Sequence, residues 1–541
     1  MKKFISLSAY LFIVYSSTIF SQGTAFISEL APVHRTYYDI QSNGSPHLIQ
    51  FDTLYPGTNV HAVFQCSLES DSLNSSRRVI FCFSTDNGDT WTDYGPQPPE
   101  YRSGFPVLQI MSDGSALIGM NTNYGSGLDR AQWFADIAPG AGTFVRLDPG
   151  ASGLGPLWPN GITTASLNNT TKFVFAAGNM LNRGLSVVNS SFSGYVAQPD
   201  ISNSFSCAFA RGQNGKIGMA YIMDATVTPG KVSYRESTDD GVTWGASVLV
   251  WNPAVNNNYG AYLGIDMTYN GNSPCIVFET VKYISNQPDI HSTARIQFWS
   301  PTVNSGNPVV LDSSNDMTGA NPQQDGFAAV CRPVIGRVRD TCFFVAYCKA
   351  RTDILDSNNY FDIYFRHSTN SGSFWYSASR ITNNSGPIRD NRYVSISGRN
   401  IYGYSMIFHM LFQQDSIPGS FVNGAEKSLA RIMYCKLVLP TGGFGIQNIG
   451  SENPEAFRLK QNFPNPFNPK TIIDFDIPKE SEVELTVYNS QGKVIAVLVD
   501  QNLTAGSYRV DWDAEKFSSG IYFYTIRAGN FYESKKMVLI K

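Results

Sequence analysis

The chain has 541 residues, of which 42% are hydrophobic and 15% are charged, with a formal net charge of −3. This length allows two or more domains with sizeable cores, and with no long basic run the sequence gives no support for nucleic-acid or anionic-membrane binding. Gly (46), Pro (28), Tyr (28) and Phe (35) are abundant, which favours an all-β protein with many turns.

Residues 1–21 have the pattern of a secretory signal peptide. Lys2 and Lys3 precede a mostly apolar stretch, residues 4–20, and Ser21 offers a small-residue cleavage point. The alternative is an N-terminal membrane helix, but serines interrupt the stretch. No other stretch reaches the roughly 18 apolar residues that a membrane span needs. We therefore expect an exported mature chain without a transmembrane segment.

Two kinds of apolar segment alternate along residues 59–440. One has a basic or acidic residue, a β-branched residue and an aromatic residue, and it occurs as RVIFCFS (78–84), KVSYRES (231–237), RIQFWSP (295–301), DIYFRHS (362–368), RIMYCKL (431–437) and, more loosely, RAQWFAD (130–136) and RGLSVVN (183–189). The other precedes each of these seven copies, and it occurs as NVHAVFQCS (59–67), SALIGMNTN (115–123), TKFVFAAGN (171–179), KIGMAYIMD (216–224), PCIVFETVK (274–282), TCFFVAYCK (341–349) and YGYSMIFHM (402–410).

This long period, built only from strands and turns, predicts a β-propeller over residues 22–440. Each repeat is one small sheet, and radial stacking covers both faces of it. Because the strands are then buried on both sides, the polar–apolar alternation within them is only partial. We predict seven blades. Six blades, with one repeat as an insertion, is the alternative, as is a parallel β-helix, whose coils are shorter than this period.

In three repeats a common nonapeptide begins at the end of the segment that carries the charged, β-branched and aromatic residues. The three copies are FSTDNGDTW (83–91), ESTDDGVTW (236–244) and HSTNSGSFW (367–375). An Asp at this spacing can accept hydrogen bonds from backbone amides across a hairpin, the Gly supplies a positive φ, and the Trp buries a large apolar surface. The positions are Ser84, Asp86, Gly88, Thr90 and Trp91; Ser237, Asp239, Gly241, Thr243 and Trp244; and Ser368, Asn370, Gly372 and Trp375.

The pattern S-x-D-x-G-x-T-W resembles the Asp box of the sialidase-like (BNR-repeat) propellers. In that superfamily the box is a turn on the periphery, away from the active site, so the resemblance implies a structural role. The third copy has Asn370 in place of Asp and Phe374 in place of Thr. An amide can still bond the backbone but cannot do acid–base work.

The same resemblance implies what an enzyme would need. Sialidases use an arginine triad for the substrate carboxylate, a Tyr–Glu nucleophile and an Asp acid/base, and they have six blades. Their early Arg-Ile-Pro motif is missing here. Arg35, Arg332 and Arg392 are the candidates for a central pocket, whereas Arg235 and Arg366 share one repeat position, which indicates blade architecture. The sequence assigns no catalytic residue.

Aromatic residues in loops between the repeats could stack on sugar rings. Trp158, Tyr124, Tyr259 and Tyr262 are the candidates, and core packing is the alternative for each. We expect no cofactor and no metal site, because the six histidines are scattered and DSSND (312–316) lacks the spacing of a calcium loop.

The eight cysteines form no CxxC pair. Cys66 with Cys82, and Cys331 with Cys342, fall on neighbouring predicted strands. A cross-strand disulfide in either pair is one expectation, and reduced, buried thiols are the other.

The composition changes after Pro440. Residues 441–458 are a Gly/Asn/Pro-rich linker, and residues 459–541 contain short apolar strands separated by NSQG, LTAG and FSSG turns. In EVELTVY, Val483, Leu485 and Val487 share one face. The segment predicts a small, Ig-like antiparallel β-sandwich.

This segment resembles the type A C-terminal sorting domain of the Bacteroidota type IX secretion system, through QNFPNPFNP, VYNSQGKVIAVLV, AGSYRVDW, SSGIYFYTIRAG and the final KKMVLIK. The resemblance implies that the secretion machinery is its partner, and that the cargo is released or attached to surface lipopolysaccharide. An ordinary accessory domain is the alternative. The sorting-motif residues are Asn462, Pro464, Asn465, Pro466, Phe467, Asn468, Pro469, Gly520 and Lys536.

Together these features predict an exported bacterial protein whose propeller binds a glycan or another surface ligand without hydrolysis. The alternatives are a sialidase-like glycoside hydrolase and a purely structural surface-layer protein.

Overall fold

The structure is a computed structural model of the whole chain. Outside the residues that it describes lie 1–8, 11–15, 21–22, 38, 41–46, 53–57, 68–75, 124–129, 148–158, 165–170, 178–179, 187–205, 224–227, 240, 242, 290, 319–326, 340–341, 383–386, 403–404, 420–427, 441–446, 451–453, 504 and 515–516. The chain divides into two units, the first comprising Met1–Thr18, Phe26–Asn400 and Phe408–Lys436, and the second Ile19–Ala25, Ile401–Ile407 and Leu437–Lys541.

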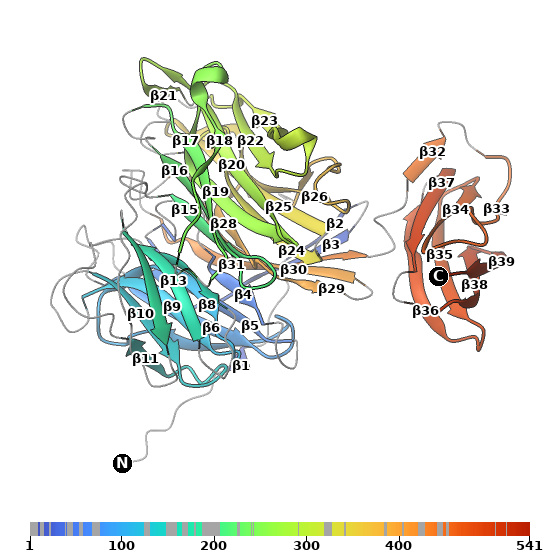
Figure 1. The fold of residues 1–541 in the computed structure, drawn as a ribbon, viewed down its shortest axis with the longest axis horizontal. Coiled ribbons are helices and arrows are strands. Elements are labelled where there is room, and N and C mark those ends of the chain that lie inside the picture. The colour runs from blue at the N-terminus through green and yellow to red at the C-terminus, as the bar shows by residue number, and fades with distance from the viewer. Residues whose placement is uncertain are drawn as a thin grey trace, which may run out of the picture. The chain divides into compact units, whose positions relative to one another are not determined.

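The strands as far as residue 440 form seven sheets, numbered here in chain order (Figure 1). Sheets 1 to 3 are, with strands in spatial order, β4 (Ile49–Phe51), β5 (Val60–Cys66), β6 (Arg78–Ser84), β7 (Trp91–Pro96) and β1 (Ala9–Tyr10); β8 (Ser103–Ile110), β9 (Ala116–Thr122), β10 (Arg130–Asp136) and β11 (Phe144–Leu147); and β12 (Pro159–Thr164), β13 (Thr171–Ala177) and β14 (Met180–Ser186).

Sheet 4 contains β15 (Cys207–Arg211), β16 (Ile217–Met223), β17 (Lys231–Ser237) and β18 (Val248–Trp251), and sheet 5 contains β19 (Tyr259–Asn270), β20 (Ser273–Ile284), β22 (Ala294–Trp299) and β23 (Val309–Ser314), with β21 (Gln287–Asp289) beside β20. Sheet 6 contains β24 (Val330–Arg339), β25 (Cys342–Leu355), β26 (Asn358–Ser368) and β27 (Ser379–Arg380). Sheet 7 contains β28 (Asp390–Ile396), β30 (Ser405–Asp415), β31 (Arg431–Pro440), β3 (Gly23–Glu29) and β2 (Ser16–Phe20), with β29 (Ile401–Tyr402) beside β30.

The described residues contain no α-helix, only two 3-10 turns, η2 (Pro253–Val255) and η3 (Asn304–Gly306). The predicted all-β class is therefore confirmed. Two short strands, β1 and β2, fall inside the predicted signal peptide. The mature chain would lack both if that peptide is removed, and the leader itself stays a prediction.

The middle strands of the sheets are buried on both faces. All seven residues of β5 and all seven of β9 are buried, whereas the outer strand β11 is half-buried to exposed along most of its length. Burial on both faces explains why polar and apolar residues alternate only partially along the middle strands. The more polar outer strands blunt the sheet edges.

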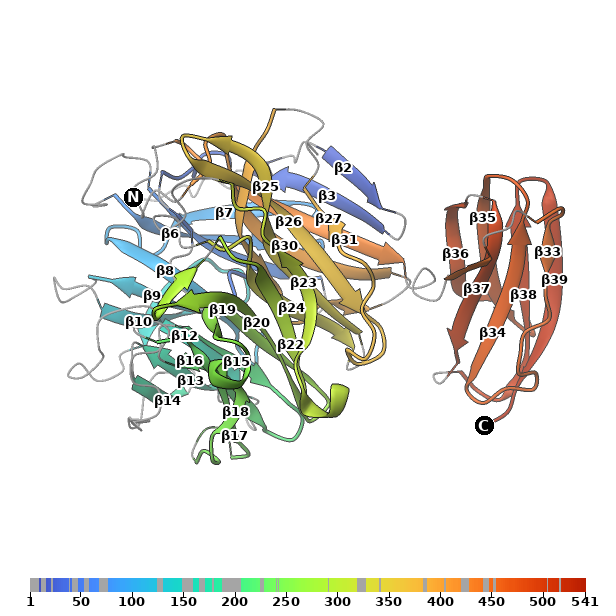
Figure 2. The same cartoon turned by 90° about the horizontal axis from the view of Figure 1, so that it is seen from above.

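The first strands of the seven sheets contact one another in succession. The order of contact is β4, β8, β12, β15, β19, β24 and β28, and β28 contacts β4 again. Figure 2 shows the succession in colour from blue through green and yellow to orange. The N-terminal strand β3 lies in sheet 7 beside β31, so that sheet combines strands from both ends of this region. The number of blades stays a prediction.

The C-terminal unit holds two further sheets, β32 (Gln447–Gly450), β37 (Gly506–Asp513), β34 (Lys470–Ile477) and β33 (Arg458–Leu459), and β36 (Val494–Leu503), β35 (Ser481–Asn489), β38 (Gly520–Ala528) and β39 (Phe531–Leu539). Ile473 and Trp512 from the first sheet and Leu485 and Ile526 from the second belong to one buried cluster. The two sheets therefore share a core, as the alternating strands predict. The Ig-like type stays a prediction.

Candidate functional site

The first nonapeptide loop, between β6 and β7, is closed by its own side chains. The Ser84 hydroxyl donates to Asp86 Oδ1 at 2.8 Å and accepts the Gly88 N–H at 2.8 Å. The Thr90 N–H and hydroxyl donate to the two Asp86 oxygens at 2.8 and 2.6 Å. Partial burial acts to raise the pKa of Asp86, but the bonds from Thr90 and Ser84 outweigh it and lower that pKa. The carboxylate is thus held ionised by its loop.

The second loop repeats these bonds. Ser237 donates to Asp239 at 2.8 Å and accepts the Gly241 N–H at 2.8 Å, and the N–H and hydroxyl of Thr243 donate to Asp239 at 2.8 and 2.7 Å. Gly241 has a φ of 81°, the left-handed conformation that the sequence predicts for this glycine.

The third loop keeps the pattern with an amide. Asn370 Oδ1 accepts the Ser368 hydroxyl at 3.1 Å and the Phe374 N–H at 2.8 Å. The Trp375 indole donates to Gly372 O at 3.0 Å, and its ring lies edge-on to Phe298 of sheet 5 at 5.0 Å. The loop thus joins two neighbouring sheets. The Asn370 amide oxygen thus accepts one hydrogen bond from Ser368 and one from Phe374.

Arg235 and Arg366 make the same bond at the same repeat position. Arg235 Nε donates to Gly245 O at 2.9 Å, and Arg366 Nε donates to Tyr376 O at 2.6 Å. Each arginine bonds a carbonyl ten residues farther along its own sheet. Arg35, by contrast, pairs with Glu29 at 2.7 Å.

Arg332 and Arg392, from the first strands of sheets 6 and 7, lie around one ring. Their guanidinium carbons are 5.3 and 4.7 Å from the centroid of Phe327, and both side chains are buried. Arg392 donates to Asp390 at 2.6 Å and to Asn359 O at 2.9 Å. The structure therefore brings together two of the three predicted arginines.

Arg332 occupies a β-bulge of β24 with a φ of 55°. Its N–H donates to Glu279 on β20, and the same carboxylate accepts the Leu263 N–H at 3.0 Å. Glu279 is fully buried. A carboxylate that accepts two backbone amides is well placed to hold a strained bulge in position.

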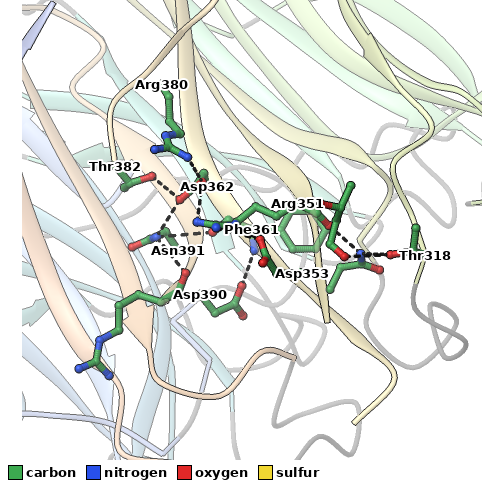
Figure 3. A network of polar contacts seen from close by, with 12 residues as sticks. Thr318, Arg351, Asp353, Phe361, Asp362, Arg380, Thr382, Asp390 and Asn391 are labelled. Carbon is green, nitrogen blue, oxygen red and sulfur yellow. Dashed lines mark hydrogen bonds and ion pairs between the residues drawn. The ribbon is translucent and has the colours of Figure 1, made fainter. Parts of the chain in front are cut away.

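Asp362 is the centre of a polar network between sheets 6 and 7 (Figure 3). It pairs with Arg380 at 3.2 Å and Arg351 at 3.4 Å, and it accepts bonds from Thr382 at 2.8 Å and Asn391 at 3.3 Å. Asp362 is fully buried, so its pairing avoids the large penalty of an uncompensated buried charge.

His47 and Asp266 pair across sheets 1 and 5. Their Nε2 and Oδ1 atoms are 3.3 Å apart, and the other ring nitrogen contacts Ile396 O at 3.0 Å. Burial acts to lower the pKa of His47, but Asp266 and the Ile396 carbonyl raise it overall. Asp266 also accepts the N–H of Ile335 at 2.8 Å. Strands of four sheets, 1, 5, 6 and 7, are thus joined at this pair.

A Tyr–Glu group is present between sheets 4 and 5, beside the second nonapeptide. Glu236 accepts the hydroxyls of Tyr234 at 2.6 Å and Tyr269 at 3.1 Å, and it pairs with Lys216 at 2.7 Å. Burial and the neighbouring acids raise the pKa of Tyr234. A phenol with a raised pKa is a poor nucleophile.

Tyr259, at the start of β19, lies next to two cations. Its half-buried ring has the Arg295 guanidinium 4.0 Å and the Lys282 ammonium 5.3 Å from its centroid. Among the described residues no ion pair joins either cation to a carboxylate, and Lys282 donates to Asn257 O. Three half-buried side chains thus offer an aromatic face beside two positive charges.

The other predicted aromatics have different outcomes. Tyr262 is half-buried in the bulged stretch of β19, and burial together with Glu279 raises its pKa although Arg332 opposes the shift. Tyr124 and Trp158 lie outside the described residues.

The structure favours the second of the two expectations for the cysteines, buried thiols, because neither suggested pair is opposite in register. Cys66 is opposite Arg78 and Cys82 opposite Ala62, four positions apart along the strands, a separation of roughly 13 Å. Cys342 is opposite Arg339, whereas Cys331 is opposite Cys348. All eight cysteines are buried free thiols.

Glu279, Asp266, Asp390, Asp362 and Arg295 were missed by the sequence analysis. A signal for the first existed: Phe64-Gln65, Phe278-Glu279 and Phe412-Gln413 share a place in the repeat. Gln65 accepts the Phe105 N–H at 2.7 Å and Gln413 accepts the Ile40 N–H at 3.0 Å, as Glu279 does for Arg332. A buried polar residue at one repeat position could have been recognised as a backbone acceptor.

Within the described parts of the chain, no group of three or more His, Cys, Asp or Glu side chains could hold a metal ion. Over the same residues no helix is long and apolar enough to cross a membrane.

The predicted sorting-motif residues 462–469 lie beside the end of β39, with Asn462 and Phe467 buried and Pro464, Asn465, Pro466 and Asn468 exposed. Asn462 donates to Pro464 O at 3.0 Å and to Thr471 at 2.8 Å, and its N–H donates to Tyr524 at 2.8 Å. Asn465 accepts the Val538 N–H at 2.9 Å. Of the remaining residues, Phe467 is buried, Pro469 O accepts the Ala514 N–H, and Gly520 and Lys536 lie on β38 and β39 opposite Leu539 and Phe523.

A search among curated proteins finds no match. The solved structures that match include an ulvan lyase of polysaccharide lyase family PL25 (12% identity, 74% of this chain and 95% of that chain, TM-score 0.43) and a protein of unknown function from Dyadobacter fermentans (12%, 76% and 99%, 0.40). An α-L-arabinofuranosidase from Podospora anserina is also similar (12%, 62% and 90%, 0.29). None of these likenesses assigns an activity to this chain.

Residues 461–541 match the family described as secretion system C-terminal sorting domain. This confirms the sorting domain that the tail resembles, and its partner is the secretion machinery. The protein is a secreted or cell-surface cargo that carries a type IX sorting domain at residues 461–541.

Proposed function

We propose that this exported protein carries a seven-bladed, sialidase-like β-propeller that binds a glycan without hydrolysing it. The cyclic order of contacts from β4 to β28 and back supports seven blades. The outer place of the N-terminal strand β3 in sheet 7 supports closure of the ring. A six-bladed ring would need one of the seven sheets to be an insertion.

The nonapeptide loops are structural Asp boxes in this proposal. Asp86 and Asp239 already accept bonds within their own loops, and Asn370 does the same without a carboxylate. Binding chemistry must then come from elsewhere on the propeller.

One observation carries the non-hydrolytic function: the buried carboxylates of sheets 5 to 7 are engaged. Asp266 accepts the Ile335 N–H, Glu279 accepts the Leu263 N–H, and Asp390 accepts the Phe361 N–H at 2.8 Å and pairs with Arg392. A glycosidase needs two carboxyl groups, or a tyrosine with a glutamate, within about 5–10 Å of each other that can reach the substrate. Carboxylates engaged in this way are poorly suited to that task.

Tyr259 with Arg295 and Lys282 is the proposed binding site. An aromatic face stacks on the apolar face of a sugar ring, and a guanidinium binds a carboxylate or sulfate in a bidentate manner. A glycan with acidic substituents fits both features. The two cations lie beside the ring, and Arg295 makes no ion pair with a described carboxylate, whereas Lys282 is opposite Asp289 of β21.

The test uses the secreted full-length protein on immobilised neutral, sialylated, uronate-containing and sulfated glycans. Retention and the mass of the sugars are read from the same samples. We expect retention of acidic glycans without cleavage. Arg295→Ala should weaken it about tenfold or more, since one charge-assisted pair contributes roughly 1.5–3 kcal/mol.

The matched control is Arg527→Ala, which removes an exposed arginine of the C-terminal unit and should leave retention unchanged. Release of a shortened sugar would establish the hydrolase alternative. If no glycan is retained or cut, the glycan function is wrong, and a structural surface protein becomes the better explanation.

A further inference from the structure

Cys331 and Cys348 are directly opposite each other on the antiparallel strands β24 and β25 of sheet 6. Opposite residues of such a pair point to the same face, with Cα atoms about 4.5–5.5 Å apart. A disulfide spans Cα separations of about 4.4–6.8 Å. The backbone register therefore already places the two cysteines for a bond.

Five of the other six cysteines are opposite a residue of another kind: Cys66 is opposite Arg78, Cys82 opposite Ala62, Cys207 opposite Tyr221, Cys275 opposite Thr268 and Cys342 opposite Arg339. Among these seven cysteines the register places only Cys331 and Cys348 opposite each other.

The compartment favours oxidation. The chain is secreted or held at the cell surface, and disulfides form and persist outside the cytosol. We propose that Cys331 and Cys348, which are free thiols in the structure, become joined by a disulfide in the secreted protein.

The step balances with a disulfide-bearing oxidant of the cell envelope. One cysteine thiolate attacks the disulfide of the oxidant and forms a mixed disulfide. The second cysteine thiolate then attacks the cysteine sulfur of this mixed disulfide and displaces the oxidant as a thiolate. The Cys331–Cys348 S–S bond forms, the S–S bond of the oxidant breaks, and the oxidant leaves as two thiols after accepting two electrons and two protons. Because both side chains are fully buried, the oxidant must act before sheet 6 is covered.

The cross-link lies where sheet 6 meets sheet 7. The Cys348 sulfur lies close to the backbone of Tyr393 and Val394 in the bulge of β28, and Cys331 precedes the bulged Arg332. A bond between the two sulfurs fastens both bulges to one strand pair. Full burial of both side chains also keeps external thiols away from the bond once the sheet has formed.

The experiment counts free thiols in the secreted full-length protein. The protein is denatured in iodoacetamide without reductant, and its intact mass is measured before and after reduction. We expect two fewer alkylated cysteines than the eight in the sequence, and all eight after reduction. Trypsin cuts at Arg337 and Arg339 between the two cysteines, so the cross-linked peptides are recovered as one species.

Two variants assign the pair. Cys348→Ser should leave every remaining cysteine alkylated without reductant, whereas Cys342→Ser should keep the two protected thiols. Serine is chosen because it is close to cysteine in size and cannot form a disulfide. Reduction should lower the Tm of the wild type by a few degrees, because a loop of this length restricts the unfolded chain, and leave the Tm of Cys348→Ser unchanged.

Eight alkylated cysteines without reductant would overturn the proposal, as would a cross-link mapped to another pair. Neither outcome depends on whether the protein binds a glycan.

Discussion

At the scale of single residues, the nonapeptide loops show how one carboxylate can look catalytic and serve a turn. Asp86 accepts bonds from Ser84 and Thr90, and Asn370 takes the same place in the third loop. This position requires an oxygen acceptor, because the backbone N–H of the residue four positions later, Thr90 or Phe374, needs a hydrogen-bond partner.

Asp86→Ala should therefore lower the free energy of unfolding by about 1–2 kcal/mol through the loss of these bonds. Asp86→Asn should lower it by less than about 1 kcal/mol, because the amide oxygen remains. Denaturant unfolding measures both changes, and retention of glycans is measured in parallel.

The control is Glu100→Ala, at an exposed glutamate of the same region, which should change stability little. If Asp86→Asn leaves stability intact but abolishes glycan binding, the loop belongs to the functional site and its structural assignment is wrong.

At the scale of elements, the second strands β5, β20 and β30 share more than their apolar pattern. His61 and His409 stand four positions before Gln65 and Gln413 and are fully buried. His61 lies 4.6 Å from the ring of Phe83, and neither of its nitrogens has a hydrogen-bond partner among the described residues. Burial lowers its pKa to about 3.

This histidine makes the protein acid-labile. Its folded pKa lies below the unfolded value of 6.5, so the unfolded chain binds a proton that the folded chain does not. Its contribution to stability is complete above pH 6.5 and is lost as the pH falls toward 3. His61→Leu should reduce the pH dependence of the unfolding free energy by up to about 1.4 kcal/mol per pH unit in this range.

Urea unfolding at several pH values between 7 and 4 measures this slope. His291→Leu, at an exposed histidine, is the control and should keep the wild-type slope. An unchanged slope in His61→Leu would show that the buried ring is protonated in the folded state.

At the scale of the whole molecule, the chain combines a cargo and an export domain. The C-terminal unit has its own buried core, and residues 461–541 match a sorting domain. Localisation is thus carried by a part of the chain that has a core of its own.

Deletion of residues 461–541 should retain the protein in the periplasm of the producing bacterium. Cell fractionation and immunoblotting measure the distribution. Tyr532→Ala, at an exposed residue of the same domain, should still be exported. Secretion of the truncated chain would show that the domain is dispensable for export.

The sequence by itself determined the features that depend on local chemistry. The period of strands and turns predicts an all-β chain because each turn residue acts within a few positions of itself. The tail was recognisable for the same reason: QNFPNPFNP and the strands after it form one contiguous segment. Even the geometry of the Asp86 loop followed from spacing, since its partners lie within eight residues.

Only the tertiary structure decided which distant residues meet. Cys331 pairs with Cys348 instead of Cys342 because the bulge in β24 and the hairpin set the register, and a shift along a strand moves every partner. Arg295 reaches Tyr259 across strands 36 residues apart in number, and His47 meets Asp266 from another sheet. Such contacts follow from how the sheets stack, which the sequence repeat alone does not specify. The proposed binding site and the opposed cysteines therefore became visible only in the folded chain.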